Sequence, residues 1–384
     1  MTTHLVLVRP QMSSGVRNRR ALPTLTGMRF FAAFYVVLFH ALPWLLQHFS
    51  VPRPLETFLS NGYLAVGLFF LLSGFILTYT YEGQIDGTPN RLRFWEARFA
   101  RIYPVYLLSL ILAYWFERGL RWGTRILVLG MIQAWNPLTP ELAGAWNYPA
   151  WSLSVEVFFY LCFPFVLPWM SRKSNRSLSW MITILLALCV LAHTPVQGLG
   201  NWDQTHLIAR VLPLPLLRMP EFLLGMAIGL KLLRNEGIGK NASRPLRAYF
   251  AVLCIFAALS LPLGEWVSLV MMPFAVLVYE LALGGDWLAR ILSTRIMVLL
   301  GGASYAVYLL QFPVRSWARV LFSYFPERIA HLSAPLTPLI LVLFSVFVFQ
   351  FCETPSRDAL RRWFARGRQR PVDMPSTEAT RNNS

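Results

Sequence analysis

Arg29 and His40 lie eleven residues apart in one apolar stretch of the chain, residues 27–46. Eleven residues of α-helix advance by about 16 Å and turn through three turns and about 20°, so both side chains lie on one face. Histidine titrates near neutral pH and can move a proton. A core histidine bonded to a neighbouring carbonyl is the alternative. The spacing therefore predicts a candidate general base, His40, with a cation, Arg29, on the same face.

Two further groups of polar residues stand where apolar stretches begin. Arg98 and Arg101 are three apart and share a helix face, where paired guanidinium groups suit anionic oxygens such as phosphate. The alternative is ordinary anchoring of a membrane helix at its cytoplasmic end. Ser152, Glu156 and Tyr160 recur every four residues and form a polar stripe. Glu156 could bond a histidine, hold a hydroxylated substrate or pair with an arginine.

The later part of the chain adds two pairs. Arg218 and Glu221 stand three apart inside an apolar stretch, which favours an internal ion pair. Ser304 and Tyr308 share a face with Gln311, whose amide cannot titrate. The four cysteines lie in apolar stretches without a CxxC pair, so we expect no metal site. Phosphate-loop, zinc-protease, dinucleotide-binding and nucleophile-elbow motifs are absent from the sequence.

The elements that position these residues are predicted to be membrane-spanning helices. Hydrophobic residues make up 56% of the 384 residues, charged residues only 14%, and mean hydropathy is +0.49. A soluble domain has about a quarter charged residues, so this composition indicates an all-α integral membrane protein in contact with the lipid bilayer. Eleven apolar stretches are present: 27–46, 61–81, 102–116, 125–135, 150–170, 178–193, 207–233, 247–263, 267–284, 296–316 and 335–353.

Loop charges decide which stretches cross. The stretch 125–135 is too short to span about 30 Å of hydrocarbon. If it lies in an outer loop, 25 of the 35 Lys and Arg residues fall in cytoplasmic segments and 7 in outer ones, as the positive-inside rule prefers. We therefore predict about ten transmembrane helices with both termini cytoplasmic. Because the basic residues are spread over short loops, nucleic acid is not an expected partner, despite a net charge of +17.

Three regions follow from this pattern: a cytoplasmic tail over 1–21, a transmembrane domain over 22–363, and a disordered basic cytoplasmic tail over 364–384. The first apolar stretch is too long for a cleavable signal, so we expect a multi-pass protein of the cell membrane. The sequence carries no indication of an oligomeric state.

Seven motifs in order resemble the membrane acyltransferase-3 family. Each motif is short, but together they cover the chain from about residue 22 to 363. They also coincide with the predicted helices. The matching segments are 25–29 with 38–40, 62–63 with 69–75, 98–104, 151–160, 221–225, 302–309 and 353–355. Two positions depart from the family pattern: Gln311 stands where many members have histidine, and Val157 where many have a second carboxylate.

The resemblance implies a bacterial O-acyltransferase that moves an acyl group, usually acetyl, from cytoplasmic acyl-CoA to a hydroxyl of a sugar or cell-surface glycan. Acetyl-CoA would be a substrate, and no permanently bound cofactor is expected. The implied catalytic residues are His40 and Glu156. Residues implied to bind the acyl donor are Arg29, Arg98 and Arg101. Residues implied to bind the acceptor or support the site are Ser73, Ser152, Tyr160, Arg218, Glu221, Ser304 and Tyr308.

Several alternatives stay open at this point. His40 could act as a base or could itself be acylated, and Glu156 could orient the imidazole or bind the acceptor. The acceptor could instead be a lipid or a secondary metabolite. A transporter without catalysis would also explain many helices with buried charges.

Overall fold

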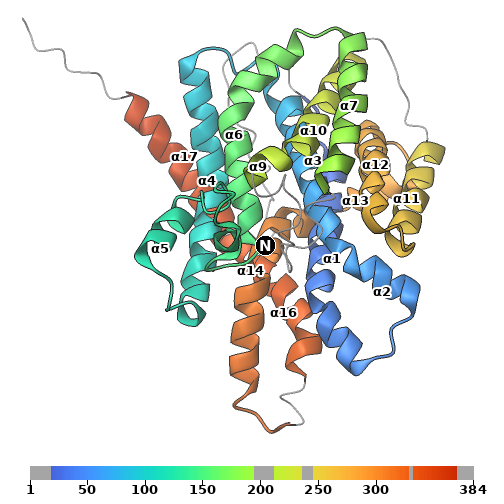
Figure 1. The fold of residues 1–384 in the computed structure, drawn as a ribbon. Helices are drawn as coiled ribbons and strands as arrows, with labels where there is room; N and C mark the ends of the chain where they lie inside the picture. The colour runs from blue at the N-terminus through green and yellow to red at the C-terminus, as the bar shows by residue number, and fades with distance from the viewer. Residues whose placement is uncertain (1–18, 194–211, 236–244, 328–331, 370–384) are drawn as a thin grey trace, which may run out of the picture.

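The computed structural model describes residues 19–193, 212–235, 245–327 and 332–369, in which helices are joined by turns and loops, without a β-strand (Figure 1). The helices are α1 (Pro23–His48), α2 (Arg53–Ser60), α3 (Ala65–Tyr81), α4 (Thr88–Ala113), α5 (Trp122–Leu129), α6 (Ala150–Ser171), α7 (Asn175–His193), α9 (Leu214–Leu217), α10 (Met219–Asn235), α11 (Pro245–Ser260), α12 (Met271–Leu283), α13 (Trp287–Leu292), α14 (Arg295–Phe322), α16 (Ser333–Val348) and α17 (Thr354–Gln369).

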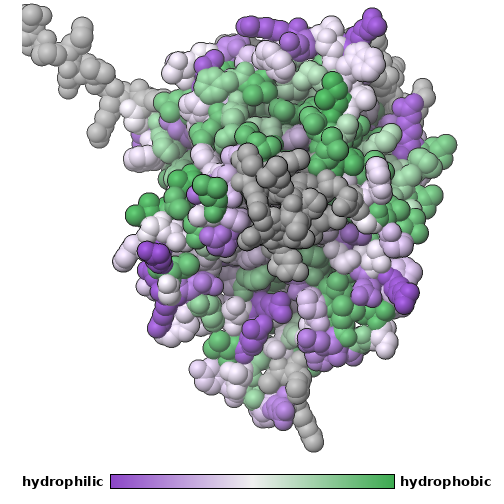
Figure 2. Space-filling view, in the orientation of Figure 1, coloured by the Kyte–Doolittle hydropathy of each residue, from purple (hydrophilic) through white to green (hydrophobic). Residues whose placement is uncertain are grey.

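The protein is an all-α integral membrane protein. Within the described residues, seven helical stretches are long and apolar enough to cross a membrane, and α7 and α11 are shorter apolar helices. Figure 1 shows the turns from α3 to α4 and from α6 to α7 at one end of the bundle, and the end of α14 and the start of α16 at the other. On the face drawn in Figure 2, hydrophilic residues gather along the upper rim and in the lower part, with hydrophobic residues between them.

Two helix crossings bring backbones into direct contact through glycine. At α3 against α10, a Cβ atom added to Gly74 would lie 2.0 Å from the carbonyl oxygen of Phe222. A Cβ on Gly225 would lie 1.9 Å from the Leu71 oxygen. At α1 against α14, a Cβ on Gly301 would lie 1.8 Å from the Thr26 oxygen. Small residues let membrane helices approach this closely, since packing rather than the hydrophobic effect holds them together.

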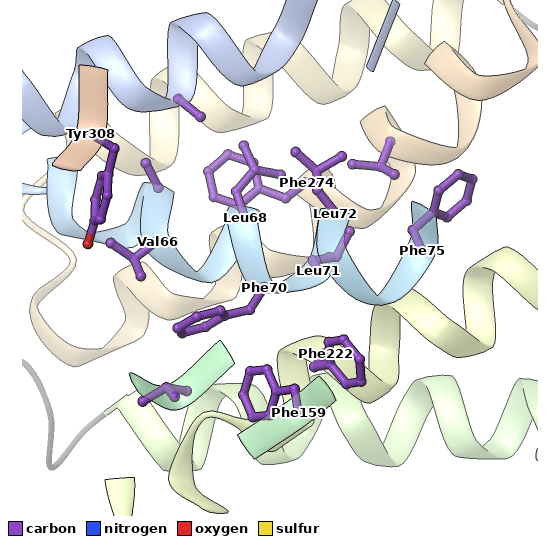
Figure 3. Packing of buried hydrophobic residues seen from close by; sticks show 14 of the residues in the cluster. Val66, Leu68, Phe70, Leu71, Leu72, Phe75, Phe159, Phe222, Phe274 and Tyr308 are labelled. Carbon is purple, nitrogen blue, oxygen red and sulfur yellow. The ribbon is translucent and has the colours of Figure 1, made fainter. Parts of the chain in front are cut away.

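Aromatic side chains fill the space between α3, α6 and α10. The ring of Phe159 lies 5.2 Å from that of Phe70 and 4.8 Å from that of Phe222 (Figure 3). All three residues are almost completely buried. This packing fixes the rotation of α6 relative to α3, and so decides which α6 residues face the polar interior.

The short stretch 125–135 does not form a spanning helix. It contributes to α5, which has eight residues and ends at Leu129, so the helix advances by only about 12 Å. Trp122 and Ile126 of α5 are largely exposed. Its length agrees with the prediction that this stretch does not cross the membrane.

Other boundaries differ from the sequence-based expectation. The predicted run 207–233 is interrupted in its described part, because α9 ends before Arg218 and α10 begins beside Pro220, which has no N–H to continue a helix. The tail expected to be disordered from 364 is helical as far as Gln369. The Phe364 ring there lies 6.5 Å from the Phe99 ring of α4, so packing supports this extra turn. Residues 1–18 and 370–384 lie outside the described residues.

Candidate functional site

A polar cavity of about 120 Å³ lies between α1, α3, α4, α6 and α14. We call it the arginine cavity. Its walls combine charged and hydroxyl side chains with apolar ones, an unusual composition for the interior of a membrane protein. The predicted site residues in its lining are Arg29, Ser73, Arg98, Arg101, Ser152, Glu156, Tyr160, Ser304 and Tyr308.

Glu156 is held by two hydroxyl groups. Its Oε1 accepts hydrogen bonds from Ser73 Oγ at 2.8 Å and from the Tyr160 hydroxyl at 2.5 Å. Tyr160 lies one turn beyond Glu156 on α6, while Ser73 comes from α3. Among the described residues, Oε2 of Glu156 has no hydrogen-bond partner. The carboxylate is therefore fixed through one oxygen and can bind a ligand through the other.

Arg98 is surrounded by aromatic rings. Its guanidinium lies 5.6 Å from the ring centre of Tyr81, 5.8 Å from that of Phe94 and 6.0 Å from that of Tyr160. One terminal nitrogen donates to the Tyr81 hydroxyl at 3.3 Å. Because the ring faces attract the cation without neutralising it, Arg98 keeps its full charge for an anionic ligand.

Arg101 is anchored by a carboxylate from the far end of the chain. It forms an ion pair and hydrogen bond with Glu353, which is fully buried. Glu353 closes a π-helical turn, Phe349–Glu353, between α16 and α17. Single π-helical turns inside α-helices are frequent at functional sites. Here the turn carries the carboxylate that orients Arg101.

Arg29 has no such partner. Among the described residues, no side chain or backbone oxygen lies within hydrogen-bond or ion-pair distance of its guanidinium. It interacts electrostatically with Glu156 and is repelled by Arg98. Three arginines thus face two carboxylates, Glu156 and the already paired Glu353. The cavity has an excess positive charge that an anionic ligand would balance.

Hydroxyl groups line the α14 side of the cavity. Ser152 Oγ lies 2.8 Å from the Tyr308 hydroxyl and 3.1 Å from the Pro149 carbonyl oxygen, so α6 and α14 are joined there. Ser304 donates to the Gly301 carbonyl within its own helix at 2.7 Å. Because its hydroxyl proton is used in this bond, Ser304 offers a ligand only an acceptor oxygen.

His40 lies in a second, smaller cavity of about 60 Å³ between α1, α14 and α16, which we call the histidine cavity. Its imidazole packs against Phe312 at 5.0 Å and against Tyr148 at 5.9 Å between ring centres. Arg315 donates to the His40 carbonyl oxygen at 3.2 Å. Burial raises the pKa of the Tyr148 phenol, which lies in the loop before α6, so it stays neutral.

The two cavities are neighbours along α14. Tyr308 lines the arginine cavity, and Gln311, one turn later, lines the histidine cavity. Arg29 and His40 share α1 in the same way. The structure gives His40 and Glu156 no direct contact, so the predicted pair is not brought together in this state.

Neither Arg218 nor Glu221 lines the arginine cavity or the histidine cavity. They form a buried ion pair at 3.2 Å beside Gly67 of α3. Arg218 also lies 5.5 Å from the Phe70 ring centre. Their position indicates that they support the packing of α10 against α3.

Two further residues position the arginines: Tyr81 contacts Arg98, and Glu353 pairs with Arg101. Tyr81 follows Ser73 by eight residues, which places both on one face of α3, so the spacing did carry a signal. Glu353 was part of the sequence motif 353–355, but the sequence did not identify the arginine that it pairs with. Its partner lies 252 positions away, and no local pattern connects the two.

Metal ligands do not gather here. Over the described residues, no group of three or more His, Cys, Asp or Glu side chains is arranged to hold a metal ion. The arrangement instead offers guanidinium groups for an anion, one free carboxylate oxygen, hydroxyl groups and a nearby imidazole. These groups suit acyl or phosphoryl chemistry on a substrate that brings its own negative charge.

Comparison with known proteins supplies the family. Residues 22–352 match the model of an acyltransferase domain family. The chain is 30% identical over 320 residues to "Acyltransferase MdmB" of Streptomyces mycarofaciens, covering 76% of this chain and 79% of that protein. It is 22% identical over 390 residues to a Staphylococcus aureus (strain COL) protein named "Putative O-acetyltransferase", covering 89% of this chain and 58% of that protein.

A shorter match joins the chain to "Protein 2 in picA locus" of Rhizobium radiobacter, at 42% identity over 89 residues, 23% of this chain and 41% of that protein. No solved structure matches the chain. The family model covers most of the chain, including every helix that lines the arginine cavity. The chain therefore belongs to the membrane acyltransferase-3 family and is an O-acyltransferase.

Proposed function

We propose that this protein transfers an acetyl group, or a related acyl group, from acyl-CoA to a hydroxyl of a sugar or glycan at or across the membrane. The observation that carries the proposal is the excess positive charge of the arginine cavity inside a chain of this family. A buried cation without a counter-charge is costly in a membrane protein and marks a functional site. An acyl donor with phosphate groups would supply the missing negative charge.

Arg29 and Arg98 are the proposed contacts for the CoA phosphates. Arg29 has no partner of its own among the described residues, and Arg98 is bound only by rings and one phenol. Arg101, oriented by Glu353, would add a third contact with a fixed geometry. Guanidinium groups bind phosphate oxygens through paired hydrogen bonds, so these residues should determine the affinity for the acyl donor.

The acyl end of CoA would extend toward His40. Arg29 and His40 are separated by about 16 Å along α1, a span that suits a long extended donor arm. His40 would accept the proton of the acceptor hydroxyl while the hydroxyl oxygen attacks the thioester carbonyl carbon. The new C–O bond forms, the C–S bond breaks, and the CoA sulfur leaves with the proton returned by His40. A positioned base of this kind contributes typically 10²–10⁴-fold to the rate.

Glu156 in the arginine cavity and two residues beside His40 would bind the substrate. Glu156, with its free oxygen, would bind a polar group of the substrate between the two cavities. Gln311 and Arg315, both lining the histidine cavity, would contact the acceptor. In the covalent alternative, His40 attacks the thioester itself and then passes the acyl group to the acceptor hydroxyl.

The relatives' names support an acyl group as the transferred group, and one of the names supports an acetyl group in particular. We place the protein in the cytoplasmic membrane of a bacterium, with about ten transmembrane helices and both termini cytoplasmic. In that orientation the arginine side of the bundle faces the compartment that holds acyl-CoA.

Radiolabelled acetyl-CoA tests the proposal with protein purified into nanodiscs. We expect Arg29→Gln and Arg98→Gln to raise the KM for acetyl-CoA about ten-fold or more. His40→Ala should keep acetyl-CoA binding and lose turnover by at least 10²-fold. Arg290→Gln, which removes an exposed arginine of α13, is the matched control. Label retained on wild-type protein but not on His40→Ala would select the covalent route. Folded wild-type protein that neither binds nor consumes acetyl-CoA would refute the proposed donor.

A further inference from the structure

An open groove of about 480 Å³ lies between α7, α10, α11 and α12, on one flank of the bundle (Figure 1). None of the residues that line it also lines the arginine or the histidine cavity. Met272 and Val276 of α12 are 59% and 37% exposed along it. In a membrane protein such a groove opens toward lipid, so its lining shows what kind of molecule fills it.

Polar and apolar residues are separated along the groove. On α7, α10 and α12 the polar residues lie toward the end of the bundle where α6 turns into α7, and the apolar ones lie deeper. On α11 the polar residue Arg247 lies in the first turn, at that same end. The polar lining residues are Ser179, Lys231, Asn235, Arg247, Tyr279 and Glu280. The apolar ones are Ile182, Leu186, Ile228, Met272, Ala275 and Val276.

The described lining residues at the polar end include two cations, Lys231 and Arg247, and one carboxylate, Glu280. Arg247 lies 3.7 Å from Glu280, a loose ion pair whose arginine is 57% exposed. Lys231 donates to Ser179 Oγ at 2.6 Å and has no carboxylate within ion-pair distance among the described residues. Asn235 donates to the Tyr279 hydroxyl at 2.9 Å. Among the described residues, Lys231 therefore places a positive charge without a paired carboxylate at the rim of an apolar groove.

We propose that this groove binds a phospholipid, with its phosphate on Lys231 and Arg247 and an acyl chain along the apolar wall. A water-soluble anion would leave the apolar wall unfilled, and a neutral lipid would leave Lys231 without a counter-charge. Basic pockets between membrane helices bind lipid phosphate in this way. A lipid chain is already surrounded by hydrocarbon before it binds, so the apolar wall gains little free energy from it and only has to match its shape. The contacts to the headgroup phosphate therefore determine which lipid is preferred.

Native mass spectrometry of detergent-purified protein titrated with phosphatidylglycerol tests this directly. We expect one lipid to be retained and the double variant Lys231→Gln/Arg247→Gln to bind it roughly ten-fold more weakly. The control Arg176→Gln/Arg290→Gln removes the same charge from exposed arginines outside the groove and should bind within two-fold of wild type. Lys231→Arg/Arg247→Lys, which keeps both charges, should also bind like wild type.

One further variant and two further ligands test whether both the phosphate and the acyl chain are needed for binding. Ala275→Leu narrows the groove at its apolar wall and keeps both cations, and it should also weaken lipid binding. This variant tests the proposal even if the charge variant fails to fold. Dioleoylglycerol, without a phosphate, should not bind, and millimolar inorganic phosphate should not displace the lipid. Unchanged affinity in the folded double variant, equal binding of dioleoylglycerol or displacement by inorganic phosphate would each overturn the proposal. None of these outcomes bears on acetyl transfer.

Discussion

At the scale of single residues, the carboxylate of Glu156 has one oxygen held by two hydroxyl groups and the other without a hydrogen-bond partner among the described residues. Ser73 and Tyr160 both donate to Oε1. Removing one of two donors leaves the carboxylate oriented by the other, whereas removing the charge abolishes its interaction with ligand. A hydrogen bond to a charged group contributes about 1.5–3 kcal/mol.

We therefore expect Glu156→Gln to lower kcat/KM for acetyl transfer by about 100-fold, and Tyr160→Phe by only about ten-fold. Ser73→Ala/Tyr160→Phe, which removes both donors, should approach the loss in Glu156→Gln. Initial rates of acetyl-CoA consumption give these values, with thermal unfolding as the control for folding. If Tyr160→Phe lost as much activity as Glu156→Gln while remaining folded, Tyr160 would have a role beyond positioning the carboxylate.

At the scale of helices, the glycine contacts between α3 and α10 set the position of the cavity wall. Because a Cβ on Gly74 or Gly225 would meet backbone atoms at about 2 Å, the two helices must separate to accommodate it. Overpacking of this kind costs typically 1–3 kcal/mol. We expect Gly74→Ala and Gly225→Ala each to lower the melting temperature and to reduce acetyl transfer, since α3 also carries Ser73.

Gly123→Ala in α5 is the matched control, because no atom lies within 4 Å of its added Cβ. Its melting temperature should stay close to that of wild type or rise slightly, as alanine favours a helix. Differential scanning fluorimetry on the three variants gives the comparison. Equal melting temperatures for Gly74→Ala and Gly123→Ala would show that α3 and α10 do not pack as closely as described.

Sequence patterns predicted most of the helices but not how their faces meet. The spacing of Arg98 and Arg101, and of Ser152, Glu156 and Tyr160, places each set on one helix face, and the structure directs both faces into one cavity. The periodicity of a helix determines which residues share one face. The rotation of one helix against another depends on contacts such as Phe70 with Phe159, which no local pattern contains. For the same reason, the sequence could not show that His40 and Glu156 line different cavities.

At the scale of the whole molecule, the direction of each helix decides which cavity opens to which side of the membrane. Between residues 172 and 324, α7, α10, α11, α12 and α14 make five crossings under the predicted topology. An odd number places the two positions on opposite sides. Between residues 122 and 324, the same topology gives six crossings, so these two positions lie on one side. The excess of Lys and Arg assigns residue 172 to the cytoplasm.

Single cysteines test this topology in a background in which the four native cysteines are alanine. Arg172→Cys, Trp122→Cys and Tyr324→Cys place a thiol at exposed positions. We expect a membrane-impermeant maleimide to label Trp122→Cys and Tyr324→Cys in right-side-out vesicles, and Arg172→Cys only in inverted ones. Labelling of Arg172→Cys from the same side as Trp122→Cys would mean that the stretch 125–135 crosses the membrane. The later basic loops would then lie outside, contrary to the positive-inside rule.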